Sequence, residues 1–207
     1  EEFRALIDKA FTSPNFEPDK SVKVIAWTNG RVHQYNEYIS QMLGQTELFN
    51  VNQTLITNQP IINHKGEIIA GTDSKVVIKA VNQIQIDSID GFNLTLGSNT
   101  THFAPTDPKD KKRVMNRFAK LKDWQNHFRV KDQWLDLRPV YASTVHKSQG
   151  STYETVFVDL DDISMNNRPS EFARLLYVAL SRPSTKLVLY GQLPEKYLVT
   201  KTDVLLK

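Results

Sequence analysis

The chain has 207 residues, 40% of them hydrophobic and 24% charged, which is enough for one large domain or two small ones with buried cores. It contains no cysteine, which excludes disulfides and thiolate metal sites, and no run of eighteen apolar residues that could cross a bilayer. A net charge of +3 is too mildly basic to indicate a nucleic-acid partner by itself. We therefore expect a globular protein in a cytoplasmic setting, with no membrane partner. The start, Glu1 to Arg4, lacks the features of a secretory signal, and we expect it to be a cut within a longer chain.

The two ends of the chain alternate between helical and strand patterns. Apolar residues at helical spacing predict a helix over 3–11, and an apolar run predicts a buried strand over 22–27. Val32, Tyr35, Ile39 and Met42 form the stripe of a second helix that ends near Gly44. The later segments are expected as strands at 140–144, 155–160 and 186–190 and a helix at 171–180. This alternation predicts an α/β layered domain.

The middle of the chain has a different texture. Short β-prone runs cover 54–62, 67–70, 75–86 and 92–96, and turn signals such as Lys65-Gly66 and Asp90-Gly91 separate them. Asp-Gly between such runs is typical of a hairpin turn. The strands are too short and too close together for parallel crossovers, so we predict a small antiparallel β-barrel inserted into the α/β domain.

A cationic segment follows this predicted barrel. Nine Lys and Arg residues lie between Lys109 and Lys131, against only Asp110 and Asp123. Asp107 and Pro108 open a helix whose apolar stripe is Val114, Phe118, Leu121, Trp124 and Phe128. The cations would then lie on its outer face, either as a solvated surface or as a salt-dependent contact to phosphates. Trp124 and Trp134 either stack on bases or fill a core, and because aromatic residues at helical spacing usually pack in a core, packing is the favoured interpretation for both.

The most informative stretch is Ser143-Thr144-Val145-His146-Lys147-Ser148-Gln149-Gly150-Ser151-Thr152, which follows a predicted buried strand. Ligands of open α/β sheets bind at the carboxyl ends of strands, and hydroxyls, backbone N–H groups and a Lys suit phosphate oxygens. The same composition also fits a solvent-exposed connecting loop.

A second stretch, Arg174-Leu175-Leu176-Tyr177-Val178-Ala179-Leu180-Ser181-Arg182-Pro183, is an apolar helix whose end delivers an arginine. A fixed Arg182 at a domain edge could neutralise charge on a transferring γ-phosphoryl group, as an arginine finger does. It could equally be a partner of the helix dipole or part of a surface salt bridge.

Together the two stretches resemble motifs V and VI of superfamily 1 helicases, particularly the Dda, RecD and Pif families. The strand 156–160 lies at the expected distance, and Ile25-Ala26-Trp27-Thr28-Asn29, with Val32 and Asn36, resembles the motif between IV and V. The resemblance implies an α/β fold of the P-loop NTPase type: a second RecA-like helicase domain at 1–45 and 139–207. Residues 46–138 take the place of an inserted SH3-like antiparallel barrel with a helical elaboration.

The resemblance also implies roles for individual residues. Contacts to single-stranded DNA are implied for Thr28, Asn29, Ser143, Thr144, His146 and Lys147. Contacts to ATP are implied for Gln149, Gly150, Thr152 and Arg182, of which Arg182 would be catalytic. Thr152 stands where many superfamily 1 motors have Glu, as it does in some Pif-like members.

No Walker sequence of the form G-x-x-x-x-G-K-[S/T] occurs in the chain, so nothing in it would cradle the phosphates. We expect no metal site here, and we read Asp159, Asp161 and Asp162 as a strand end and a turn. The family places the Mg²⁺ ligands in an N-terminal RecA-like domain, which is therefore an expected partner in the same natural chain. The chain alone is expected to be inactive.

The resemblance implies the C-terminal part of an ATP-dependent DNA helicase that moves 5′ to 3′ on single-stranded or forked DNA in a bacterial or phage-infected cell. Replication, repair or recombination proteins are possible partners. Two alternatives stay open: a stand-alone nucleic-acid-binding module, and an alpha-type helicase subunit of an exonuclease V complex.

Overall fold

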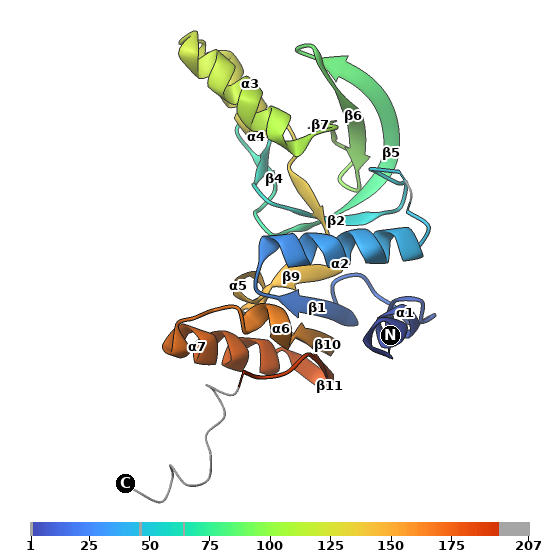
Figure 1. Ribbon diagram of the computed structural model, residues 1–207. Helices are drawn as coiled ribbons and strands as arrows, with labels where there is room; N and C mark the ends of the chain where they lie inside the picture. The colour runs from blue at the N-terminus through green and yellow to red at the C-terminus, as the bar shows by residue number, and fades with distance from the viewer. Residues whose placement is uncertain (1, 46, 64, 195–207) are drawn as a thin grey trace, which may run out of the picture. The chain divides into compact units, whose positions relative to one another are not determined.

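The computed structural model describes residues 2–45, 47–63 and 65–194 (Figure 1). The chain divides into two compact units. Residues up to Gly44 and those from Val140 onward form the first unit, and Gln45–Pro139 form the second. The expected insertion at 46–138 thus differs from the observed second unit by one residue at each end.

A parallel sheet forms the centre of the first unit. Its strands, in spatial order, are β11 (Pro183–Tyr190), β10 (Tyr153–Asp159), β1 (Val22–Ala26) and β9 (Ala142–Thr144). Every neighbouring pair is parallel. All five residues of β1 are buried, as expected for a central strand covered on both faces. The predicted α/β layering with a parallel sheet is confirmed.

Helices cover both faces of this sheet. Ile25, Val156 and Val158 share one core with residues of α5 (Val145–Ser148), α6 (Leu160–Ile163) and α7 (Pro169–Leu180). On the other face, α1 (Glu2–Phe11) places the ring of Phe3 5.6 Å from that of Phe157. There α2 (Asn29–Met42) is joined to β9 through Asn36, whose amide hydrogen bonds with both the N–H and the C=O of Ala142.

The second unit contains an antiparallel sheet in the order β7-β6-β5-β2-β8. The strands are β2 (Thr54–Thr57), β5 (Lys75–Ile86), β6 (Ile89–Leu96), β7 (Thr101–Pro105) and β8 (Leu137–Pro139), and a separate pair consists of β3 (Ile61–Ile62) and β4 (Ile68–Ala70). Leu55, Ile78 and Leu94 lie in its core. Within the described residues no pairing joins the edge strands β7 and β8, so closure into a barrel stays a prediction.

The predicted hairpin turn at Asp90-Gly91 is wrong. The turn between β5 and β6 is made by Asp87 and Ser88, which have φ angles of 54° and 65°, whereas Asp90 and Gly91 lie inside β6. Gly91 is required there for another reason: a Cβ atom would lie 2.4 Å from the carbonyl oxygen of Ala104 on the neighbouring strand. The glycine thus marks a close approach of two strands.

The predicted single cationic helix is two helices, α3 (Pro108–Lys120) and α4 (Trp124–Gln133). Lys122 has a φ of 57° and its N–H donates to the Ala119 carbonyl at 3.0 Å, while the N–H of Asp123 donates to the Phe118 carbonyl at 2.9 Å. These two bonds are a Schellman motif, which ends a helix. The Asp123 carboxylate then caps α4 by accepting from the N–H of Asn126.

This break changes which side chains are buried. Val114 is buried, but Leu121, Trp124 and Phe128 are 70%, 55% and 50% exposed, so the predicted continuous apolar stripe and the predicted packing of Trp124 are wrong. Trp134 is buried with its ring 4.5 Å from that of Phe103, as predicted.

Lys111 does not lie on the outer face of the helix, where the cations were predicted to lie. It is buried, and its ammonium group donates to the Trp134 carbonyl at 2.7 Å and to Gln59 Oε1 at 3.2 Å. Burial, only partly offset by nearby Asp136, lowers the pKa of this lysine to about 8.

This shifted pKa predicts how stability depends on pH. In the unfolded chain Lys111 keeps a pKa near 10.5, so between pH 8 and that value the unfolded state binds more protons and stability rises with pH. We expect the free energy of unfolding to rise by roughly 1–2 kcal/mol from pH 8 to 9.5, and the Lys111→Met variant to lack this rise. Urea unfolding followed by tryptophan fluorescence measures both, and the same pH dependence in the two proteins would contradict the assignment.

Candidate functional site

The residues predicted to contact DNA gather at the carboxyl edge of the parallel sheet. Ala26 and Thr144, the last residues of β1 and β9, are register partners, so the segments that follow these strands leave the sheet at the same edge. Thr28 and Asn29 follow β1, whereas His146 and Lys147 lie in α5 directly after β9. Asn29, His146 and Lys147 are exposed. The structure therefore brings together predicted contacts from two segments more than a hundred residues apart in sequence.

Two predicted contacts at this edge are buried. Thr144 caps α5, and its hydroxyl accepts from the N–H of Lys147 at 3.3 Å. Ser143 is 7% exposed, and its hydroxyl has no hydrogen-bond partner among the described residues. These side chains lie beneath the exposed residues of α5, so Thr144 shapes the loop whatever else it contacts.

A buried carboxylate holds Thr28 in place. Asp162, 5% exposed, accepts hydrogen bonds from the backbone N–H groups of Trp27 and Thr28 at 2.6 and 2.8 Å and from the Thr28 hydroxyl at 2.8 Å. The Thr28 hydroxyl in turn accepts from the N–H of Arg31 and caps α2. With its hydroxyl engaged twice, Thr28 is fixed rather than free to rotate.

Asp159, at the end of β10, is the centre of a second network. Its side chain is fully buried and accepts from Arg31 Nε at 2.6 Å, from the Tyr35 hydroxyl at 2.7 Å and from the N–H of Asp162 at 3.1 Å. Burial and the bond to this carboxylate raise the pKa of the Tyr35 hydroxyl above its ordinary value. The two aspartates thereby tie the β10–α6 turn to the first turns of α2.

The residues predicted to contact ATP lie at the opposite edge. Gln149, Gly150 and Thr152 precede β10, and Arg182 precedes β11; the first residues of these parallel strands, Tyr153 and Pro183, are register partners. The loop and the arginine are in direct contact. Arg182 Nη1 donates to the Ser151 carbonyl at 2.9 Å, and the Arg182 carbonyl accepts from the N–H of Tyr153 at 3.0 Å.

The rest of the Arg182 guanidinium bonds to its own helix end. Nε donates to the Val178 carbonyl and Nη2 to the Ser181 hydroxyl, both at 2.9 Å. The bond to the Val178 carbonyl places the Arg182 guanidinium at the C-terminal end of α7, where it can act as a partner of the helix dipole, one of the alternatives for this residue. In the described part of the chain no carboxylate lies within ion-pair distance of Arg182, so the salt-bridge alternative is not observed. Its positive charge is therefore uncompensated.

The loop beside Arg182 presents an open surface. Gln149, Gly150 and Thr152 are exposed. Gly150 has a φ of 86°, which favours glycine, and no atom lies within 4 Å of where its Cβ would stand. An anionic ligand could approach this backbone while facing an uncompensated guanidinium, so these residues fit one wall of a nucleotide site.

A magnesium site does not fit this unit. The described residues contain no cluster of three or more His, Asp or Glu side chains suited to a metal ion, and hydrogen bonds already engage the buried carboxylates of Asp159 and Asp162. Asp161 accepts from the N–H of Gln192 at 3.0 Å. The reading of this turn as structural agrees with these contacts.

Within the part of the chain that the structure describes, none of the helices combines the length and the apolar composition that a membrane span requires.

The positioning network of Asp159, Asp162, Arg31 and Tyr35 had no predicted role. A local signal existed for Asp159, because an Asp just before a helix commonly caps it by accepting a hydrogen bond from the N–H three residues later. Here that donor is the N–H of Asp162. The partners across the sheet had no such signal, since they lie 124 to 135 residues away in sequence.

Residues 139–190 match the family model described as the UvrD-like helicase C-terminal domain. This range contains both the loop 143–152 and Arg182. The resemblance of this part to the C-terminal region of superfamily 1 helicases is thus confirmed.

Individual relatives cover different shares of the chain. An uncharacterised protein of Acanthamoeba polyphaga mimivirus is 38% identical over 61 residues, which is 30% of this chain and 12% of that protein. The Pif1 helicase from Bacteroides in complex with ADP-AlF3 and single-stranded DNA matches 99% of this chain and 48% of its own, at 13% identity and a TM-score of 0.45. The Pif1 helicase from Candida albicans matches 99% of this chain and 53% of its own, at 12% identity and a TM-score of 0.42. The chain thus spans only a part of each of these proteins.

Proposed function

We propose that the chain is the second RecA-like domain, with an inserted SH3-like barrel, of an ATP-dependent DNA helicase. The first unit corresponds to the RecA-like domain and the second to the insertion. The match of residues 139–190 to a helicase C-terminal domain supports this proposal. The observation that carries it is the bond from Arg182 to the Ser151 carbonyl, because it joins the motif V loop to the motif VI arginine.

The two edges of the parallel sheet have different tasks in this proposal. At the carboxyl edge, Asn29, His146 and Lys147 contact the phosphates of a single strand, and the fixed Thr28 and Thr144 shape that surface. At the amino edge, Gln149, Gly150 and Thr152 contact ATP, and Arg182 is the catalytic arginine. The segment 145–152, which consists of α5 and the turn after it, connects the two edges. A displacement of the residues at one edge is therefore transmitted to the other edge through this short segment.

Binding and hydrolysis of ATP with Mg²⁺ would supply the free energy for movement along DNA, and we assign the Mg²⁺ ligands to an N-terminal RecA-like domain. Arg182 neutralises negative charge that develops on the phosphoryl group. To do so its Nη atoms exchange the Ser151 carbonyl and the Ser181 hydroxyl for phosphate oxygens. Because the Ser151 carbonyl loses its bond to Arg182 in this exchange, nucleotide binding changes the contacts of the motif V loop directly.

The direction of movement is proposed as 5′ to 3′, on single-stranded or forked DNA, in the cytoplasm. The solved Pif1 helicases named above include one bound to single-stranded DNA, and a further match concerns unwinding of forked duplex DNA by two coordinating Pif1 helicases. Replication, repair or recombination proteins are proposed as partners.

The strand-binding surface can be tested on the 207-residue chain itself. We expect Lys147→Ala to weaken binding of a fluorescent oligothymidylate about three- to tenfold at low salt and to lower the slope of log affinity against log salt by about 0.7, the contribution of one phosphate contact. Lys186→Ala, which removes another exposed cation of the same unit, is the matched control and should leave the slope unchanged. Fluorescence anisotropy across a salt series measures the affinity and the slope. Equal slopes for the wild type, Lys147→Ala and Lys186→Ala would show that Lys147 does not contact the strand.

A further inference from the structure

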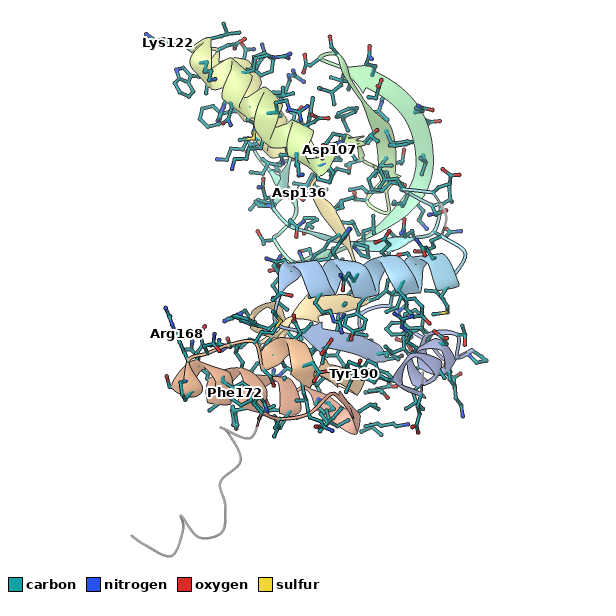
Figure 2. The ribbon with its side chains drawn as sticks, in the orientation of Figure 1. Asp107, Lys122, Asp136, Arg168, Phe172 and Tyr190 are labelled. Atoms are coloured by element: carbon teal, nitrogen blue, oxygen red, sulfur yellow. The ribbon has the colours of Figure 1, made fainter. Side chains whose placement is uncertain are left out.

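The tip of the α3–α4 hairpin exposes apolar surface that the fold does not use. Leu121, Trp124 and Phe128, which we call the hairpin tip, are 70%, 55% and 50% exposed. They lie at or just beyond the Schellman turn, and Figure 2 shows Lys122 of that turn at the end of α3 remote from Asp107. Large apolar side chains gathered on a protein surface commonly mark a binding site.

The aromatic rings of the hairpin tip are ordered by their neighbours. His127 stands between them, with its ring 5.7 Å from that of Trp124 and 5.3 Å from that of Phe128, in edge-to-face arrangements. The His127 Nδ1 atom hydrogen bonds with the Met115 carbonyl of α3 at 2.9 Å, which fixes the imidazole between the two helices. The faces of Trp124 and Phe128 are therefore presented from a supported position.

Cations lie on the same two helices as these rings, and those nearest the hairpin tip make no ion pair. Arg117, Lys120, Lys122 and Lys131 are exposed, and none of them is paired with a carboxylate in the described part of the chain. Three carboxylates of this region are already engaged: Asp110 with Arg113 at 2.5 Å, Asp87 with Arg129 at 2.6 Å, and Asp123 as the cap of α4. Lys131 Nζ lies 5.5 Å from the centre of the Phe128 ring, so charge and aromatic surface coincide.

This combination selects among partners. A purely apolar partner would have to bury the surrounding lysines without compensation, which is unfavourable. A polyanion with planar groups satisfies both features, since phosphates approach the cations while bases stack on the exposed rings. We propose that the hairpin tip is a second contact for single-stranded DNA, with Trp124 and Phe128 as its stacking platform. The inference rests on the proposed function for its DNA partner and adds a contact site in the second unit.

The test compares variants of the 207-residue chain in oligothymidylate binding by anisotropy. Trp124→Ala and Phe128→Ala are each expected to weaken binding about fivefold or more, because one base–aromatic stack is worth about 1–3 kcal/mol. Stacking releases no counterions, so the salt slope is expected to stay unchanged. Trp124→Phe keeps an aromatic face and should retain most of the affinity, whereas Trp124→Leu keeps apolar area without a π-face and should lose it. Ile68→Ala removes another exposed apolar side chain of the same unit and should bind as the wild type does.

The outcomes separate this inference from the proposed function. Wild-type affinity in both Trp124→Ala and Phe128→Ala would overturn the stacking platform, and it would leave the proposed function standing if Lys147→Ala still weakens binding. Loss of affinity in Trp124→Ala with none in Lys147→Ala would support the platform and count against the motif V surface. Equal binding by Trp124→Leu and the wild type would also overturn the inference, because apolar contact alone would then suffice.

Discussion

Arg182→Ala is expected to lower DNA-stimulated ATP turnover of the natural protein that contains this chain by a factor of about a thousand or more, while single-strand affinity stays within about twofold of wild type. The reason is electrostatic: the arginine carries a charge that no described carboxylate neutralises, at the end of the sheet opposite the proposed DNA surface. Steady-state phosphate release with and without oligothymidylate measures the turnover.

Two further variants separate chemistry from structure, because Arg182 also bonds to the Val178 and Ser151 carbonyls. Arg182→Gln retains hydrogen-bond donors without the charge and is expected to be nearly as inactive as the alanine variant. Arg182→Lys keeps the charge but not the planar fork and should retain a small, measurable rate. Turnover of Arg182→Gln within a few-fold of wild type would contradict a catalytic role for the guanidinium charge.

Asp159→Ala is expected to reduce the free energy of unfolding by about 3–5 kcal/mol, since it removes a fully buried carboxylate and leaves three hydrogen-bond donors without their acceptor. Arg31 Nε, the Tyr35 hydroxyl and the N–H of Asp162 would all lose their acceptor. Urea unfolding measures the loss.

The neighbouring Asp161 provides the matched control for this prediction. It is exposed and accepts a single hydrogen bond, from the N–H of Gln192, so Asp161→Ala is expected to cost about 1 kcal/mol or less. If the two alanine variants were equally stable, the Asp159 network would not hold α2 to the sheet as we describe.

The sequence predicted the first unit well because its signals are local. The apolar run at 22–27 and the stripe of Val32, Tyr35 and Ile39 each specify one element, and parallel packing follows from their alternation. The second unit was predicted less well where a turn did not depend on glycine. Asp87, Ser88 and Lys122 all adopt positive φ angles, which sequence patterns assign to glycine or asparagine first.

The candidate site shows the same division. Its chemical residue types lie in three short stretches, 25–29, 143–152 and 174–183, and could be identified from sequence. Their separation onto opposite edges of one sheet could not, because it depends on the register of Tyr153 with Pro183 and of Ala26 with Thr144. The buried carboxylate of Asp162 was hidden for a related reason, since it contacts Thr28 across 134 residues of sequence.

A strand-separation assay of the natural protein decides whether it is a helicase. The substrate pair is a fluorescent duplex with a single-stranded tail on either the 5′ or the 3′ side, incubated with ATP and Mg²⁺ and analysed for released strand. We expect ATP-dependent release from the 5′-tailed duplex. Absence of release from both duplexes, despite tight binding to the tails, would contradict a helicase and support a stand-alone nucleic-acid-binding module.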